Sequence, residues 1–351
     1  MSSGDISTVV DAILREPMAI ANGGTGFVGA DLPVDLLVAT GRPFGHLPWR
    51  AEGATAWADR WLESGFPGWT RSILEDWHDG RFDSLSQVVF SRADDASQRL
   101  YYYVRELQQR GLLAGPAALI FDIALVPRES SLAHTTQSLR SLGEALGASE
   151  ADLRGAFPRV NALRRQLAQW QGNRSGDGPA HERLGRATLF SDATRWIGPA
   201  PAPATAEAGR RVLLAGSVPP DERLHRAVES AGACIVGEAH AQGLLRLGAP
   251  LEPVDESPWQ SLARHLRATS AAPRSVFDRA QWIVAQARQA RAAAVVLWLT
   301  REDEALAWHV PAQRAALQSA GIPCLALTAR RWSADDGALD EISAFCRETL
   351  T

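Results

Sequence analysis

Lysine is absent from the 351-residue sequence, in which all 36 basic residues are arginine. Without a lysine amine, the chain can neither form a Schiff base with a carbonyl substrate nor carry the lysine of a phosphate-binding P-loop. The arginines accompany abundant alanine, glycine and proline, which is typical of a GC-rich coding bias. The absence of lysine therefore excludes two kinds of site without indicating a function.

Cysteine is scarce as well. The three cysteines, Cys234, Cys324 and Cys346, are odd in number and widely spaced. This spacing fits neither a disulfide framework nor a set of metal ligands. Two of them lie within apolar runs, which predicts small buried thiols.

An excess of positive charge and long apolar runs are also missing. The formal net charge is -4, and no basic stripe is visible, so we expect no nucleic-acid partner. The apolar stretch Ala292–Thr300 is too short to cross a bilayer, and the opening MSSGDIST lacks the basic and apolar segments of a signal peptide. We expect a cytoplasmic protein with no membrane partner.

Short apolar segments alternate with helical patterns in the second half of the chain. The predicted strands are Arg211–Ser217, Cys234–Gly237, Ala294–Thr300 and Pro323–Thr328. The predicted helices are Asp221–Ala231, Ser275–Arg291 and Pro311–Ala320, the last closed by Gly321. Continuous apolar strands separated by helices predict a parallel sheet covered on both faces.

The first half repeats this pattern less regularly. Buried strands are predicted at Gln87–Phe90 and Ala117–Val126, with a helix at Asp94–Gln109 between them. A further helix is predicted at Pro158–Gln171, where Pro158 suits the first turn. The predicted fold class is therefore α/β, with two flavodoxin-like or Rossmann-like parallel-sheet domains facing a cleft and additional helices.

Two polar, glycine- or proline-rich tracts mark the middle of the chain, at Gln171–Pro179 and Gly198–Ala208. Such tracts resist packing and are typical of linkers. We predict an N-terminal domain over residues 1–175, a linker over 176–208 and a C-terminal domain over 209–351.

The segment Gly24–Gly29 (GTGFVG) matches the glycine spacing of dinucleotide-binding turns. That motif functions only where a strand enters the turn and a helix leaves it. Here the preceding residues, Val9–Ile20, are predicted to be helical, and Pro33 follows closely. We therefore do not expect dinucleotide binding.

Several phrases of the sequence resemble one enzyme family. They include VGADLPVDLLVATGRPFGHL from Val28, WTRSILEDWHDGRFDSLSQVVF from Trp69, DDASQRLYYYVREL from Asp94 and RVLLAGSVPPDERLHRAVESAGACIVGE from Arg211. In these, and in the last two helix–strand segments, the chain is similar to subunits of the 2-hydroxyacyl-CoA dehydratase and benzoyl-CoA reductase family, including the D-component of 2-hydroxyglutaryl-CoA dehydratase. The resemblance spans nearly the whole chain.

The resemblance implies an iron-sulfur cluster, whose cysteine ligands would fall at Pro67 or Gly68, at Asp94, at or next to Glu302, and in the loop from His240. None of these positions holds cysteine. Cluster irons need thiolates, which carboxylates and proline do not replace. We therefore predict no bound iron-sulfur cofactor, and radical dehydration of the lyase-like type, or ring reduction, cannot be centred on this chain alone.

The resemblance places Asp94, Asp95, Glu302, Asp303 and His240 at one cleft, and Asp94, Glu302 and His240 are our catalytic candidates. Oxygen ligands with one imidazole suit Mg, Mn or non-haem Fe. In the simpler interpretation, Asp94 caps the following helix, and Glu302 and Asp303 are solvated. We predict no metal site. The isolated histidines, such as His46, have no partner spacing that indicates catalysis.

Acyl-CoA is the ligand that the resemblance implies. Arg71, Ser72 and the Gly216–Ser217 turn are the candidate binding residues, because a guanidinium and backbone N–H groups can bind a phosphate or a thioester carbonyl. The alternative is an ordinary strand-to-helix turn and a surface arginine.

These observations predict a cluster-free subunit that helps to bind acyl-CoA beside a homologous, cysteine-bearing partner, as a heterodimer or a homodimer. The alternative is a stand-alone enzyme that performs non-redox or metal-assisted acyl-thioester chemistry in the same cleft. A structural or regulatory paralogue is a third possibility.

Overall fold

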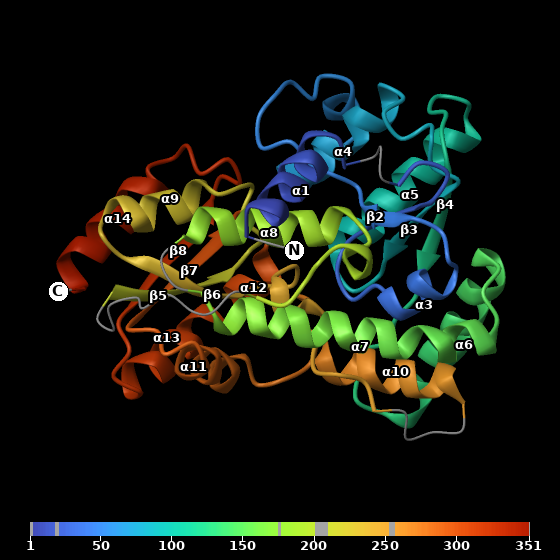
Figure 1. The fold of residues 1–351 in the computed structure, drawn as a ribbon. Coiled ribbons are helices and arrows are strands. Elements are labelled where there is room, and N and C mark those ends of the chain that lie inside the picture. Colours follow the sequence, from blue (N-terminus) through green and yellow to red (C-terminus); the bar gives the residue numbers. More distant parts are fainter. Residues whose placement is uncertain (1–2, 18–20, 175–176, 201–209, 253–256, 351) are drawn as a thin grey trace. The chain divides into compact units, whose positions relative to one another are not determined.

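The computed structural model describes residues 3–17, 21–174, 177–200, 210–252 and 257–350. These residues form an α/β fold with two four-stranded, all-parallel sheets, which confirms the predicted fold class. The chain forms two compact units, which we describe separately (Figure 1). Unit 1 comprises Met1–Gln166, Arg186–Gly198 and Arg246–Val276, and unit 2 comprises Leu167–Gly185, Pro199–Leu245 and Phe277–Thr351.

The sheet of unit 1 has the strand order β2-β1-β3-β4. Its strands are β1 (Thr25–Val28), β2 (Phe44–His46), β3 (Gln87–Ser91) and β4 (Ala117–Phe121). The predicted strands at 87–90 and 117–126 are confirmed, although β4 ends at Phe121. Strands β1 and β2 were not predicted, because each contains a glycine that interrupts the apolar pattern.

The glycine motif at residues 24–29 lies in the sheet. Strand β1 occupies the four residues between Gly24 and Gly29, so these glycines do not form a dinucleotide-binding turn. A Cβ on Gly24 would lie 2.0 Å from the carbonyl oxygen of Pro43, and one on Gly26 would lie 2.7 Å from Leu47. The glycines therefore allow close packing inside the sheet.

Helices surround this sheet. Unit 1 contains α1 (Ser3–Arg15), α3 (Val34–Ala39), α4 (Gly68–His78), α5 (Asp95–Gln109), α6 (Glu129–Leu146), α10 (Pro258–Thr269) and the short turns η1 (Ala58–Arg60) and η2 (Ala193–Arg195). Helix α3 follows Pro33, and Gly41 beyond its end has a φ of +67°, the left-handed conformation in which glycine commonly ends a helix.

Helices α7 (Glu150–Gly172) and α8 (Gly178–Phe190) each contribute residues to both units. The prediction that α7 begins near Pro158 was wrong, because Pro158 lies inside the helix. The reason is a stronger start signal upstream. The backbone N–H of Ser149 donates to the Asp152 carboxylate over 2.9 Å, and the N–H of Asp152 donates to the Ser149 hydroxyl over 3.2 Å.

The sheet of unit 2 has the equivalent order β6-β5-β7-β8. Its strands are β5 (Arg211–Gly216), β6 (Cys234–Ala239), β7 (Ala294–Thr300) and β8 (Cys324–Arg330). Its helices are α9 (Arg223–Ser230), α11 (Arg279–Gln289), α12 (Glu304–Ala307), α13 (Val310–Ser319) and α14 (Ala338–Thr349), and the turn η4 (Leu244–Leu247) lies at its border. All four predicted strands and the three predicted helices are present, with ends shifted by a few residues.

The core of unit 2 explains why its strands were predictable. Strand β7 is buried at all seven positions, and its side chains pack with those of α11 and α13. Figure 1 shows α9 and α14 on one face of the sheet and α11 and α13 on the other. Strands covered on both faces must be apolar throughout, and this pattern is visible in the sequence.

Residues 176 and 201–208 of the predicted linker lie outside the described residues, whereas 178–190 form α8. The predicted domain limits at 175 and 209 stay predictions. Among the helices described, none combines the length and apolar character needed to cross a membrane.

Candidate functional site

The strand order directs attention to one edge of each sheet. In an open parallel sheet, ligands bind beyond the carboxyl ends of the strands, where neighbouring connections leave in opposite directions. That point lies between β1 and β3 in unit 1 and between β5 and β7 in unit 2. We call these places the unit 1 edge, formed by residues 29–31 and 91–97, and the unit 2 edge, formed by residues 216–217 and 300–303.

Asp94 lies at the unit 1 edge and caps α5, as the simpler interpretation predicted. Its carboxylate accepts the backbone N–H of Ser97 over 2.7 Å and the Ser97 hydroxyl over 2.6 Å. It also accepts the N–H of Ala30, at the end of β1, over 3.4 Å. Burial raises the pKa of Asp94, and these hydrogen bonds oppose the rise. The side chain therefore joins α5 to the end of β1.

His46 holds the neighbouring backbone at the same edge. Its Nε2 accepts the N–H of Gly29 over 3.1 Å, and its Nδ1 donates to the carbonyl of Leu47 over 2.6 Å. These partners require the neutral ring with its proton on Nδ1. Burial lowers the pKa of His46 to about 4. The residue acts as a fixed hydrogen-bond partner of the Gly29 turn, where φ is +99°.

The unit 2 edge is built around Ser217. Its hydroxyl donates to the Asp303 carboxylate and accepts the N–H of Thr300 over 2.9 Å. Its own N–H donates to the carbonyl of Trp298 over 2.8 Å. Gly216 has a φ of +113°, and a Cβ there would lie 2.3 Å from the same Trp298 oxygen. Only glycine fits this turn, which brings Ser217 against the end of β7.

The prediction that Glu302 and Asp303 are solvated was wrong. Asp303 accepts the Ser217 hydroxyl, and the Glu302 side chain is only 12% exposed. Glu302 Oε2 is buried and has no hydrogen-bond partner among the described residues, while its Oε1 lies 3.9 Å from Nε of Arg301. The loop after β7 folds back on the sheet, so both carboxylates lie partly beneath the surface.

His240 follows β6 in unit 2, and its nearest ionic partner is Glu238, 3.5 Å away. Glu238 also contacts His225 over 2.6 Å and Arg174 over 3.2 Å, and all three side chains are buried. Burial raises the pKa of Glu238, but the charge of Arg174 and hydrogen bonds from both histidines hold it well below its usual range. Burial lowers the pKa of His225. We call these four residues the Glu238 network.

The sequence did not predict the Glu238 network, since its members come from distant positions on α9, β6 and the end of α7. One signal was present, because a glutamate inside an otherwise apolar strand requires a buried partner. Among the predicted site residues of unit 2, His240 therefore pairs with Glu238, whereas Ser217 and Asp303 pair with each other.

The candidate metal ligands divide between the two units, with Asp94 and Asp95 in unit 1 and the other three in unit 2. Within the described part of the chain, no group of three or more His, Cys, Asp or Glu side chains is arranged to hold a metal ion.

The cysteines lie away from both edges. Cys234 begins β6 and Cys324 begins β8, at the amino ends of parallel strands, and Cys346 is buried on α14. Burial raises the pKa of the Cys324 and Cys346 thiols to about 11. A cluster needs several thiolates converging at one place. The three thiols begin strands on opposite sides of the sheet or lie on α14, so they do not converge as the ligands of an iron-sulfur cluster do.

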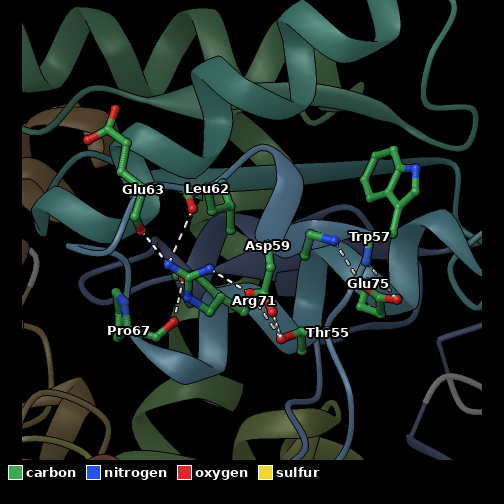
Figure 2. A network of polar contacts seen from close by, with 10 residues as sticks. Thr55, Trp57, Asp59, Leu62, Glu63, Pro67, Arg71 and Glu75 are labelled. Carbon is green, nitrogen blue, oxygen red and sulfur yellow. Dashed lines mark hydrogen bonds and ion pairs between the residues drawn. The ribbon is translucent and has the colours of Figure 1, made fainter.

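Arg71 and Ser72 lie on α4. Figure 2 shows Arg71 holding the preceding loop. The Arg71 guanidinium donates to Asp59 over 2.6 Å and to the carbonyls of Leu62 and Glu63. The Ser72 hydroxyl accepts the N–H of Arg50 over 3.1 Å. The same loop is fixed by Glu75, which accepts the N–H of Ala58 over 2.8 Å. A ligand-binding role of Arg71 and Ser72 stays a prediction.

Comparison with protein families gives a match over residues 30–345, to the family described as 2-hydroxyglutaryl-CoA dehydratase, D-component. The matched region includes every candidate residue above and, except for Gly29, both sheet edges. Among curated proteins, the comparison finds no match. Since the match covers most of the chain, this protein belongs to the 2-hydroxyglutaryl-CoA dehydratase D-component family.

Proposed function

We propose that this chain is a cluster-free subunit of a complex like the 2-hydroxyacyl-CoA dehydratases and benzoyl-CoA reductases. It works beside a homologous, cysteine-bearing partner and helps to bind an acyl-CoA thioester. Family membership supports the general role, and the positions of the three thiols, with the raised pKa of Cys324 and Cys346, support the cluster-free state.

The location of the thiols is the observation that carries the proposal. At the edges where a parallel α/β sheet binds ligands, this chain has Asp94 in unit 1 and Ser217 with Asp303 in unit 2. These groups are hard oxygen donors, which do not substitute for thiolates around iron and sulfide. Any redox chemistry in the complex then depends on the partner.

The unit 2 edge is the part of this chain that we assign to the acyl-CoA. The Gly216 turn brings Ser217 against the end of β7, where Asp303 and Thr300 fix its hydroxyl at the carboxyl edge of the sheet, the place at which parallel α/β sheets bind ligands. Arg71 and Ser72 support this assignment less directly, because they lie on α4 and hold the loop before it, not the end of a strand.

The test is anaerobic co-expression with a cysteine-bearing homologous subunit, followed by native mass, iron and CoA-ester analysis. The control complex carries Cys234→Ala, Cys324→Ala and Cys346→Ala in this chain. We expect a heterodimer that retains its iron in both preparations. Loss of iron from the control complex would overturn the proposal. Turnover of an acyl-CoA by this chain alone would establish the stand-alone enzyme instead.

A further inference from the structure

Unit 1 contains a cavity that is lined by none of the residues of the unit 1 edge. Its volume is about 420 Å³, within the usual range for small-molecule sites. It lies where the end of α1, the segment after β2, the end of α4 and helix α8 come together. None of the residues assigned above to acyl-CoA binding lines it.

The lining has an excess of positive charge. Four arginines, Arg15, Arg50, Arg81 and Arg186, face two carboxylates, Glu16 and Asp76. A cavity with twice as many guanidinium groups as carboxylates attracts an anion.

The buried carboxylate is already paired with two of these arginines. Asp76 is 3% exposed, with Nη2 of Arg50 at 3.0 Å and Nε of Arg81 at 3.3 Å. A guanidinium has five N–H donors in a planar fork, so each arginine retains donors beyond this contact. Arg15 is exposed at the end of α1 and adds its charge to the cavity wall.

Aromatic side chains form the apolar part of the wall. Trp49, Phe82 and Phe190 line the cavity, and all three are buried. The rings of Trp49 and Phe190 meet edge to face, with centroids 5.0 Å apart. This packing fixes a rigid apolar surface beside the guanidinium groups, against which the flat part of a ligand can lie.

We propose that this cavity binds a small phosphate-bearing molecule with a flat ring, of the nucleotide class. The arginine forks match the geometry of phosphate oxygens, and the aromatic wall matches the ring. The proposal does not depend on the proposed function, because it concerns a different set of residues.

The test is calorimetric titration of the full chain with ADP, and with adenosine as the probe that lacks phosphate. The variant Arg15→Gln/Arg81→Gln removes two charges from exposed side chains. The control variant Arg110→Gln removes an exposed arginine on the far end of α5, outside the cavity. We expect ADP to bind more tightly than adenosine. The double variant should weaken ADP binding about tenfold or more, since charge-assisted hydrogen bonds are lost, and the control should leave it unchanged.

Equal affinity of the double variant and the control for ADP would overturn the proposal, as would failure of ADP to bind at millimolar concentration. Photolabelling with 8-azido-ADP supplies a second measurement that needs no variant. Label in the peptides that contain Trp49 or Phe82 supports the site, and label confined to other peptides contradicts it.

Discussion

The two sheet edges have the same strand order but different chemistry. At the unit 1 edge, the Asp94 carboxylate is occupied by the N–H groups of Ser97 and Ala30 and by a hydroxyl, so it mainly holds α5 against β1. At the unit 2 edge, Ser217 is held between an acid and a backbone N–H. Strand order brings polar groups to the same place, but the side chains there differ, with a helix-capping carboxylate in unit 1 and a hydroxyl paired with a carboxylate in unit 2.

The two edges also differ in what lies beside them. Near the unit 2 edge, the Glu238 network buries four ionisable side chains together. Beside the unit 1 edge, His46 is neutral and is held by backbone groups. We therefore expect substitutions in unit 2 to act through charge and substitutions in unit 1 to act through hydrogen-bond geometry.

The largest expected effect follows Glu238→Leu. The substitution leaves Arg174 buried without its carboxylate partner, which costs about 3–5 kcal/mol of unfolding free energy. Urea unfolding followed by circular dichroism measures it, with Glu348→Leu on exposed α14 surface as the control. If Glu238→Leu lowers the free energy of unfolding by less than Asp94→Ala does, the expected difference between the two units is wrong.

The next effect is a dependence of stability on pH that involves His46. Because the folded-state pKa is lowered to about 4, the unfolded chain binds a proton first as the pH falls below 6.5. The contribution to stability is therefore fully present above pH 6.5 and is lost towards pH 4, by at most about 1.4 kcal/mol per pH unit. Unfolding curves of the parent chain and His46→Asn at several pH values measure it.

His181 and His225 in unit 2 also have lowered pKa values because of burial, and they add to the acid sensitivity of the parent chain. The variant His46→Asn should show a shallower loss of stability than the parent between pH 6.5 and 4. If the stability of both proteins falls equally steeply with pH, the titration of His46 does not contribute to the acid sensitivity.

A smaller effect is expected for Asp94→Ala. The cap of α5 and the contact to Ala30 are lost together, at a cost of about 1–2 kcal/mol. The matched control is Asp95→Ala, since Asp95 is exposed on the first turn of the same helix. Equal losses in the two variants, measured by thermal unfolding, would contradict the role of Asp94 as the cap.

The smallest effect on stability is expected for Ser217→Ala, together with a specific effect on binding. Within the proposed function, the variant weakens acyl-CoA binding by the complex about tenfold, because the Gly216–Ser217 turn loses its hydrogen bonds to Asp303 and Thr300. Ser97→Ala removes the corresponding hydroxyl at the unit 1 edge and should leave acyl-CoA affinity unchanged. If Ser217→Ala and Ser97→Ala weaken acyl-CoA binding equally, the two edges do not differ in their contribution to acyl-CoA affinity.

The sequence predicted those features of the structure that depend on a few neighbouring residues. The strands of unit 2 and the cap at Asp94 were predicted, because continuous apolar runs and helix-start residues act over a few positions. Strands β1 and β2 were missed, since Gly26 and Gly45 are explained only by tight contacts with Leu47 and Phe190. The local start at Ser149 was overlooked beside the more obvious Pro158.

The candidate sites depend on contacts between distant residues, which the sequence did not reveal. The resemblance indicated Ser217 and Asp303 separately, but their hydrogen bond required the folded loop after β7. The Glu238 network joins residues separated by more than sixty positions, Arg174 and Glu238 among them. The hydrophobic periodicity of a sequence indicates which side chains are buried, but it does not indicate which buried side chains contact one another.

The most direct test of the cluster-free state is anaerobic reconstitution of the purified chain alone with iron and sulfide, followed by iron analysis and visible absorption spectroscopy. The positions of Cys234, Cys324 and Cys346, and the raised pKa of the latter two thiols, predict that, after desalting, no iron-sulfur absorption remains. A stable cluster bound to this chain, lost when these three cysteines are replaced by alanine, would contradict the central claim.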